Sequence, residues 1–177
     1  MQAWVAPTTA LVMCTILQAA EKSHMTTVNE TIGREDPFGL GRFISAQDQV
    51  YDRVLAELRR GDKRTHWMWY IFPQLYGLGY SQTSQRYAIR SIEEAREYLH
   101  HPVLGTRLVE CAEVVLAVEG RSALEIFGSP DDLKLKSSMT LFASVAEPGS
   151  VFVRVLAKYF QGERDDRTVQ LLEKWKR

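Results

Sequence analysis

The chain has 177 residues, which is enough for one domain with a sizeable buried core and too few for two ordinary domains. Lysine plus arginine and aspartate plus glutamate both number 22, so no net field attracts polyanions or anionic membranes. Hydrophobic residues at 45% and charged residues at 25% are typical of a globular protein and exclude a disordered chain. We therefore expect one folded domain without membrane association, and nucleic acid is the least favoured partner.

The N-terminal segment needs separate treatment. Residues 10–20 are apolar but too short to span a bilayer, and residues 1–9 contain no Lys or Arg of the kind that precedes a signal-peptide core. A signal peptide and a true start at Met25 are both open alternatives. We expect residues 1–35 to be a poorly ordered or mis-assigned extension, and residues 36–176 to form a single helical domain.

Apolar periodicity predicts the first elements of this domain. A turn at residues 36–39 precedes Phe43 to Leu58, where apolar residues recur at helical spacing, and two arginines and Gly61 follow as stop signals. We predict one helix there. The aromatic run from Trp67 to Phe72 is expected to be largely buried, as a short helix or turn followed by a long loop.

In the C-terminal half, capping and stop signals mark successive helices. Ser91 with Glu94, and Ser122 with Glu125, have the spacing of capping boxes, while residues 129–132 place an N-cap, a proline and two carboxylates at a helix start. Helices are expected from Ser91 to before Pro102, from about Pro102 to Glu119, from Ser122 to Gly128, from Ser129 to about Val145, from Val151 to Phe160 behind Ser150, and from Asp165 through Trp175. The expected fold is all-α, a compact single-domain bundle of about six to eight helices with irregular connections.

Metal and cofactor motifs do not emerge from the sequence. Cys14 and Cys111 belong to no Cys-x-x-Cys or Cys/His pattern, which favours a cytoplasmic location. Residues 77–79 are a lone Gly-x-Gly rather than a dinucleotide fingerprint. We expect no metal and no cofactor.

The segment around His66 combines groups that could bind a ligand. A phosphate or carboxylate could meet Arg64, a planar base or sugar could stack on Trp67 or Trp69, and His66 could transfer a proton near neutral pH. The alternative is structural: the aromatic residues anchor the core, and the cations are solvated. Aromatic clusters serve packing more often than they serve ligands.

A second group of polar residues opens the helix predicted from Ser129. Helical spacing puts Asp131, Lys134 and Ser138 on one stripe, which would offer carboxylate, ammonium and hydroxyl groups together. Capping and ion pairing explain the same residues without a substrate. Arg86 and Tyr87 would join His66 in one cleft if the intervening loop folds back.

Six blocks in the expected order carry a family resemblance. They are DPFGLGRFISAQ, HWMWYIFPQLYGLG, YAIRSIEEAREYL, HPVLGTRL, EIFGSPDDLKLKSSMTLF and KYFQGERDDRT. From about Asp36 to Leu172 the chain resembles the bacterial family DUF1810, sometimes labelled calpastatin-like. The resemblance implies an all-α fold and no established activity. The rhythm of SSMTLF, KYF and a terminal leucine pair is also loosely similar to NADAR-type ADP-ribose glycohydrolases, and countless packed helices share such a rhythm.

These observations lead to two hypotheses. The first is a site that binds a phosphate-bearing or nucleotide-derived, ADP-ribose-like small molecule and, if the protein is an enzyme, hydrolyses a glycosidic bond. The second is a non-enzymatic protein-interaction or regulatory module, whose partner is unknown. For the first, the catalytic candidates are His66 and Asp131, and the binding candidates are Arg64, Trp67, Trp69, Gln74, Arg86, Tyr87, Lys134 and Ser138.

Overall fold

The computed structural model describes residues 36–175, and the chain from Phe38 onward forms one compact unit. The expectation for residues 1–35 lies outside the described residues. Within them the chain forms ten helices and no strand, apart from an isolated parallel bridge between Leu75 and Ile89. The all-α prediction is confirmed. None of the helices in residues 36–175 is long and apolar enough to cross a bilayer.

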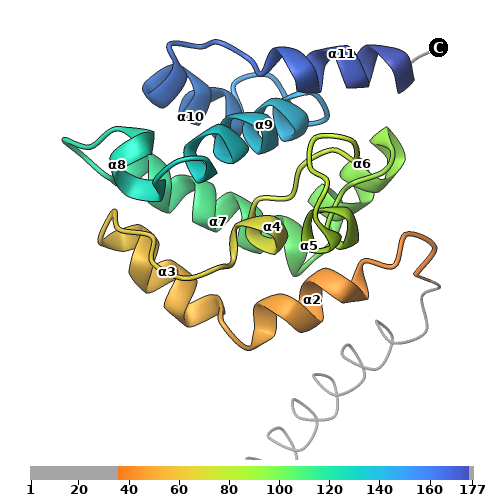
Figure 1. The fold of residues 1–177 in the computed structure, drawn as a ribbon, viewed down its shortest axis with the longest axis horizontal. Coiled ribbons are helices and arrows are strands. Elements are labelled where there is room, and N and C mark those ends of the chain that lie inside the picture. The colour runs from red at the N-terminus through yellow and green to blue at the C-terminus, as the bar shows by residue number, and fades with distance from the viewer. Residues whose placement is uncertain (1–35, 176–177) are drawn as a thin grey trace, which may run out of the picture. The chain divides into compact units, whose positions relative to one another are not determined.

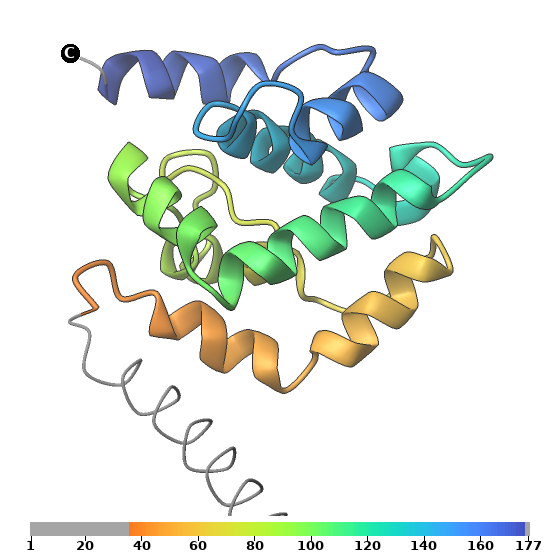
Figure 2. The same cartoon turned by 180° about the vertical axis from the view of Figure 1, so that it is seen from behind.

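The helices pack in three layers, with the longest helix in the middle layer. In chain order they are α2 (Gly41–Asp48), α3 (Tyr51–Arg59), α4 (Met68–Ile71), α5 (Gln82–Arg86), α6 (Ile92–His100), α7 (Leu104–Ala117), α8 (Ala123–Phe127), α9 (Asp131–Ala143), α10 (Val151–Phe160) and α11 (Asp166–Trp175). Both ribbon views show α7 across the middle, with α2 and α3 on one side and α9, α10 and α11 on the other (Figures 1 and 2). The short helices α4 and α5 lie on the face toward the viewer in Figure 1.

The single helix predicted from Phe43 to Leu58 is wrong, because the chain breaks between α2 and α3. Val50 leaves the helical region, with φ of −132° and ψ of −5°. The buried Gln47 side chain holds the end of α2 by donating to Tyr70 O at 2.7 Å and Tyr98 Oη at 3.0 Å. The bend lets Phe43 and Leu58, one from each helix, both become fully buried. This break and the unpredicted α5 explain why the described residues hold more helices than expected.

Two of the predicted caps form and others do not. Ser91 accepts from Glu94 N, and Ser122 makes the full capping box with Glu125. Ser129 was expected to cap α9, but Pro130 occupies the cap position and no side chain caps the helix. Ser150 occupies the N-cap position of α10, yet its hydroxyl makes no capping bond. Spacing therefore located these helix starts correctly, while the hydrogen bonds at them depended on the surrounding chain.

Arg42 joins three parts of the fold and carries the first testable prediction. Its guanidinium donates to the carbonyl groups of Phe38, Gly39, Arg86 and Ala88 and forms an ion pair with the buried carboxylate of Glu94. Arg42→Gln should lower the free energy of unfolding by about 2 kcal/mol, because Glu94 would keep a buried charge without its cation.

Urea unfolding of Arg42→Gln and a matched Arg154→Gln variant measures this effect. Arg154 pairs with Glu113 at 3.0 Å, but both side chains are about half exposed. Its replacement should therefore change stability by less than about 0.5 kcal/mol. Equal losses in the two variants would show that Arg42 is an ordinary surface cation.

Candidate functional site

Glu57 organises the segment that connects α3 to α4. Its side chain is buried, and its two carboxylate oxygens accept from Arg64 N at 2.9 Å, Thr65 N at 3.1 Å, Thr65 Oγ1 at 2.7 Å and Trp67 Nε1 at 2.7 Å. Burial by itself raises the pKa of Glu57, but these hydrogen bonds outweigh burial and lower the pKa to about 2. Glu57 is therefore a carboxylate at neutral pH, and it fixes the backbone directly after Lys63.

Lys63 and Lys134 meet at one carboxylate, that of Asp131. Lys63 Nζ lies 2.6 Å from Asp131 Oδ2, and Lys134 Nζ lies 2.6 Å from Asp131 Oδ1. Burial alone raises the pKa of Asp131, but the bonds and charges of Lys134 and Lys63 outweigh burial and lower it. The two ammonium groups come from chain segments far apart in sequence, so Asp131 ties the start of α9 to the segment before α4.

The ammonium group of Lys134 also lies over Trp69. Its Nζ is 4.0 Å from the centroid of the Trp69 ring, within the range of a cation–π contact. The Lys134 side chain is 20% exposed, whereas that of Lys63 is 6% exposed. We call Lys63, Trp69, Asp131 and Lys134 the Lys–Asp–Trp cluster. Within it, Lys134 is the cation that solvent can reach, held between a carboxylate and a half-buried indole.

The two tryptophans of the aromatic run have different surroundings. Trp67 is 1% exposed, packs against Phe72 and Phe127, and donates its indole N–H to Glu57. Trp69 is half-buried and faces Lys134. The structure thus places Trp67 in the core and leaves Trp69 partly exposed beside Lys134.

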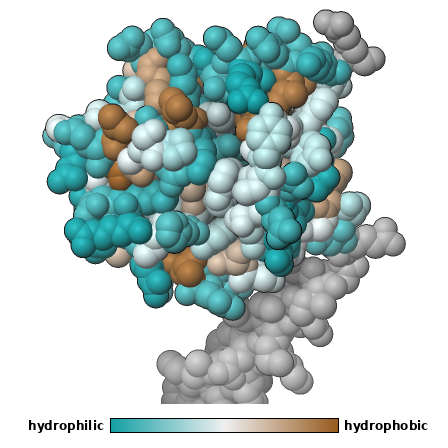
Figure 3. Space-filling model, viewed as in Figure 1, coloured by the Kyte–Doolittle hydropathy of each residue, from teal (hydrophilic) through white to brown (hydrophobic). Residues whose placement is uncertain are grey.

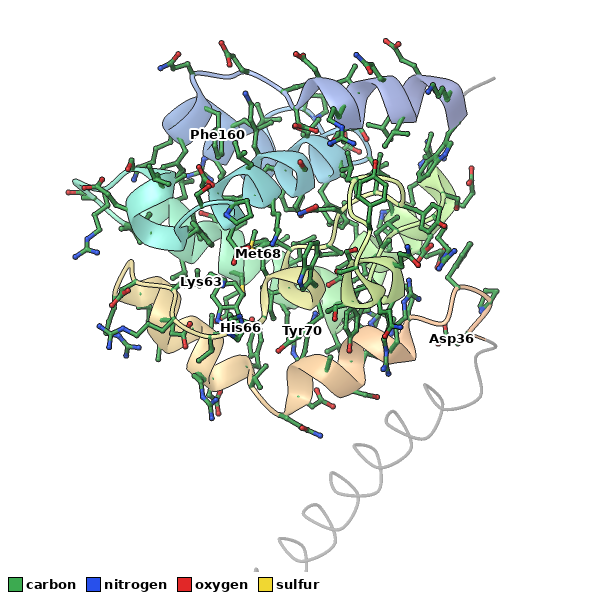
Figure 4. The ribbon with its side chains drawn as sticks, viewed as in Figure 1. Asp36, Lys63, His66, Met68, Tyr70 and Phe160 are labelled. Carbon is green, nitrogen blue, oxygen red and sulfur yellow. The ribbon has the colours of Figure 1, made fainter. Side chains whose placement is uncertain are left out.

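The other predicted residues of the aromatic segment and α5 lie at the surface. His66 is exposed on the segment between α3 and α4, where Figure 4 labels it beside Lys63. Arg64 is also exposed and pairs with Asp62 through Nη2 at 2.7 Å. Arg86 is exposed and lies over Tyr87, whose half-buried ring packs against the core. None of these contacts links the four residues to Asp131.

Gln74 and Ser138 have buried polar atoms without a partner in the described part of the chain. They are Gln74 Nε2 and Ser138 Oγ. The neighbouring hydroxyl groups on α9, unlike that of Ser138, have hydrogen-bond partners. Ser137 donates to Leu133 O and Thr140 donates to Lys136 O, one turn back in each case. Buried polar groups are usually hydrogen-bonded, so the lack of a partner for these two atoms is an unusual feature of the predicted site residues.

Sequence reasoning did not select Glu57 or Lys63 as site residues. Glu57 lies three residues after Val54, on the inward stripe of α3, so a carboxylate among apolar positions was the available signal. No local pattern in the sequence distinguishes Lys63 from the exposed Arg64 that follows it. Its backbone N–H donates to Ile126 O at 2.8 Å, a contact between distant segments that spacing does not reveal.

A cavity of about 270 Å³ lies away from the Lys–Asp–Trp cluster. Its lining comes from α6, α7, the turn after α9 and the start of α10: Leu99, His100, Val109, Glu113, Val145, Ala146, Glu147, Ser150, Val151 and Phe152. It contains none of the predicted site residues. The Lys–Asp–Trp cluster therefore lies outside this cavity, at the partly exposed surface. Among residues 36–175, no three His, Cys, Asp or Glu side chains gather in a way that could hold a metal ion.

Comparison with known proteins assigns the family. Residues 37–172 match the family model described as a protein of unknown function, DUF1810, and the chain belongs to this family. It is similar to the conserved hypothetical protein Rv1873 from Mycobacterium tuberculosis. The two sequences are 58% identical, and the crystal structure of Rv1873 matches this fold with a TM-score of 0.77. The match covers 78% of this chain and 99% of that protein. No curated protein matches the chain.

Proposed function

We propose that this protein binds a phosphate-bearing or nucleotide-derived small molecule at the Lys–Asp–Trp cluster. The observation that carries the proposal is the position of Lys134, whose ammonium group is fixed by Asp131 at 2.6 Å and lies 4.0 Å from the Trp69 ring centroid. A cation that is already held in place loses little conformational entropy when an anion binds. The Trp69 ring beside it adds a cation–π contact that helps to hold the ammonium group in place.

The charges of the cluster favour an anion. Within the cluster, two ammonium groups share the single carboxylate of Asp131. The nearby acid Glu57 is buried and directed at backbone and side-chain donors. Lys134 is therefore expected to contact phosphate oxygens directly, while Lys63 holds Asp131 from the protein side.

A more specific form of the proposal is that the protein hydrolyses a glycosidic bond in the bound ligand. Asp131, ionised because its pKa is lowered, would stabilise the positive charge that develops on the sugar. His66, exposed and close in sequence to Lys63, would serve as the proton-transfer group. Arg64 and Arg86, which are both exposed, would supply further ligand contacts. Binding and hydrolysis are separable, since a site can hold a ligand without placing a catalytic group at its glycosidic bond.

Thermal-shift measurements with ADP, ADP-ribose, NAD and ribose 5-phosphate test binding. A ligand at ten times its dissociation constant should raise the melting temperature by about 3 to 5 °C. Lys134→Gln should abolish the increase. Lys136→Gln is the matched control, because Lys136 lies on the same helix with 19% exposure but pairs with Glu163. Absence of stabilisation by every compound at millimolar concentration would reject the proposal.

Incubation with the ligands that bind tests hydrolysis separately. Chromatography would follow release of free base or ribose, and Asp131→Asn should lower the rate by about 100-fold or more. A ligand that binds through Lys134 and is recovered unchanged would leave the binding proposal in place and reject hydrolysis.

The second candidate is a protein-interaction module, and one observation favours it. Leu124 on α8 and Leu133 on α9 are 54% and 57% exposed, and a partner protein could cover these apolar side chains. Light scattering of the purified chain, compared with a Leu124→Ser and Leu133→Ser double variant, would reveal association through these residues. A monomer in both cases would count against self-association at this surface.

A further inference from the structure

Four exposed residues form a connected patch beside the proposed site. The Arg90 guanidinium lies 4.8 Å from the centroid of the Tyr76 ring, and Arg90 Nη2 donates to Gln85 O at 3.3 Å. Gln85 Nε2 in turn donates to Tyr80 O at 3.2 Å. Tyr76 is 45% exposed and Tyr80 is 83% exposed. We call Tyr76, Tyr80, Gln85 and Arg90 the Tyr–Arg patch.

Gly79, the residue before Tyr80, lies close to Trp69. A Cβ at Gly79 would lie 2.7 Å from both Cβ and Oγ of Ser84, so the loop approaches the start of α5 more closely than another residue allows. The same position lies 3.7 Å from Cη2 of Trp69. Trp69 therefore contacts Lys134 through its ring face and approaches the loop at its edge. The Lys134 ammonium group and the residue before Tyr80 thus both lie close to the Trp69 indole.

The chain segment that carries the Tyr–Arg patch contains no carboxylate side chains. From Lys63 to Ile92 the sequence contains no Asp or Glu. The carboxylate of Glu94 does approach Arg90, but it is buried, accepts from Arg90 N at 2.8 Å and is paired with Arg42. In Figure 3, pale side chains of intermediate hydropathy gather over α4, α5 and the loop between them. The patch thus offers exposed aromatic rings and a guanidinium without a competing exposed acid of its own segment.

We infer that the ligand of the proposed site is a nucleotide, with its base on the Tyr–Arg patch and its phosphate groups at Lys134. This inference rests on the proposed function and narrows its ligand class. Flat bases stack on exposed tyrosine rings and on guanidinium planes, and a surface without carboxylates does not repel the attached phosphates. Tyr80 has the most exposed ring of the patch and is the stacking residue. A sugar phosphate would use Lys134 and leave the patch empty.

Isothermal titration calorimetry with ADP, ribose 5-phosphate and inorganic pyrophosphate separates base from phosphate. ADP should bind the wild-type chain about tenfold more tightly than either ribose 5-phosphate or pyrophosphate, which has the same two phosphate groups as ADP, because one stacked base contributes about this difference. Tyr80→Ala should remove that difference and leave ribose 5-phosphate binding unchanged, whereas Tyr80→Phe should retain it. Because Tyr80 is exposed, both variants should fold normally. Equal melting temperatures of the variants and the wild-type chain would check this.

The outcomes distinguish the inference from the function on which it rests. Equal affinity of ADP and ribose 5-phosphate, both lost in Lys134→Gln, would overturn the base subsite and leave the proposed function standing. Tight ADP binding that Tyr80→Ala does not weaken would also overturn the inference. Failure of all three compounds to bind the wild-type chain would overturn both.

Discussion

Glu57→Gln should lower the free energy of unfolding by about 3 kcal/mol at neutral pH, because the buried carboxylate has more donors than an amide can satisfy. The carboxylate accepts from two backbone N–H groups, the Thr65 hydroxyl and the Trp67 indole. An amide at the same position would offer one acceptor oxygen and direct an NH₂ group at other donors. The backbone after Lys63 would lose its anchor, so the Lys–Asp–Trp cluster should loosen as well.

The pH dependence of this effect gives a second readout. The pKa of Glu57 is lowered from 4.5 to about 2 in the folded chain. A lowered folded-state pKa stabilises the fold above the unfolded value, and the contribution is lost as the pH falls toward 2. The stability difference between wild type and Glu57→Gln should therefore be largest above about pH 4.5 and shrink below it. Denaturant unfolding from pH 7 to pH 3 measures it, and a difference that grows on acidification would contradict the assignment.

Gly105→Ala should destabilise the fold by about 3 kcal/mol or more, although alanine usually favours a helix. Gly105 lies in the first turn of α7 and is buried. A Cβ there would lie 1.9 Å from the carbonyl oxygen of Leu99 and 2.7 Å from its carbonyl carbon. Both are backbone atoms, so α6 and α7 would have to separate. Thr106→Ala, at the exposed neighbouring position, is the control.

Thermal unfolding of the two variants tests this contact. For a chain of this size, Gly105→Ala should lower the melting temperature by about 6 to 12 °C, and Thr106→Ala should change it little. An unchanged or raised melting temperature in Gly105→Ala would mean that the close approach of α6 to α7 does not occur in solution.

The sequence predicted the fold best where local signals agree with packing. The capping box at Ser122 and the amphipathic spacing of α11 led to correct helices because both signals act within one helix. The break at Val50 escaped prediction because the apolar spacing runs through it, and the cause is the distant contact of Gln47 with Tyr70 and Tyr98. Ser129 failed as a cap because Pro130 takes the cap position.

The candidate site was only partly readable from the sequence for the same reason. Helical spacing correctly paired Asp131 with Lys134, since their contact lies within one turn of α9. The choice between Trp67 and Trp69 required knowledge of which indole meets Glu57 and which meets Lys134, and both contacts join distant segments. The bridging of Asp131 by Lys63 likewise depends on the tertiary fold.

The indole N–H signals of the four tryptophans provide the most direct test of the central claim, that a ligand binds beside Lys134 and Trp69. In a ¹H–¹⁵N spectrum, Trp69→Phe would assign the Trp69 signal, and Trp67→Phe would assign the signal that is bonded to Glu57. Titration with ADP to concentrations on the order of millimolar should shift the Trp69 signal and leave that of Trp67 in place. A spectrum in which Trp69 does not respond, or in which Trp67 responds instead, would contradict the account.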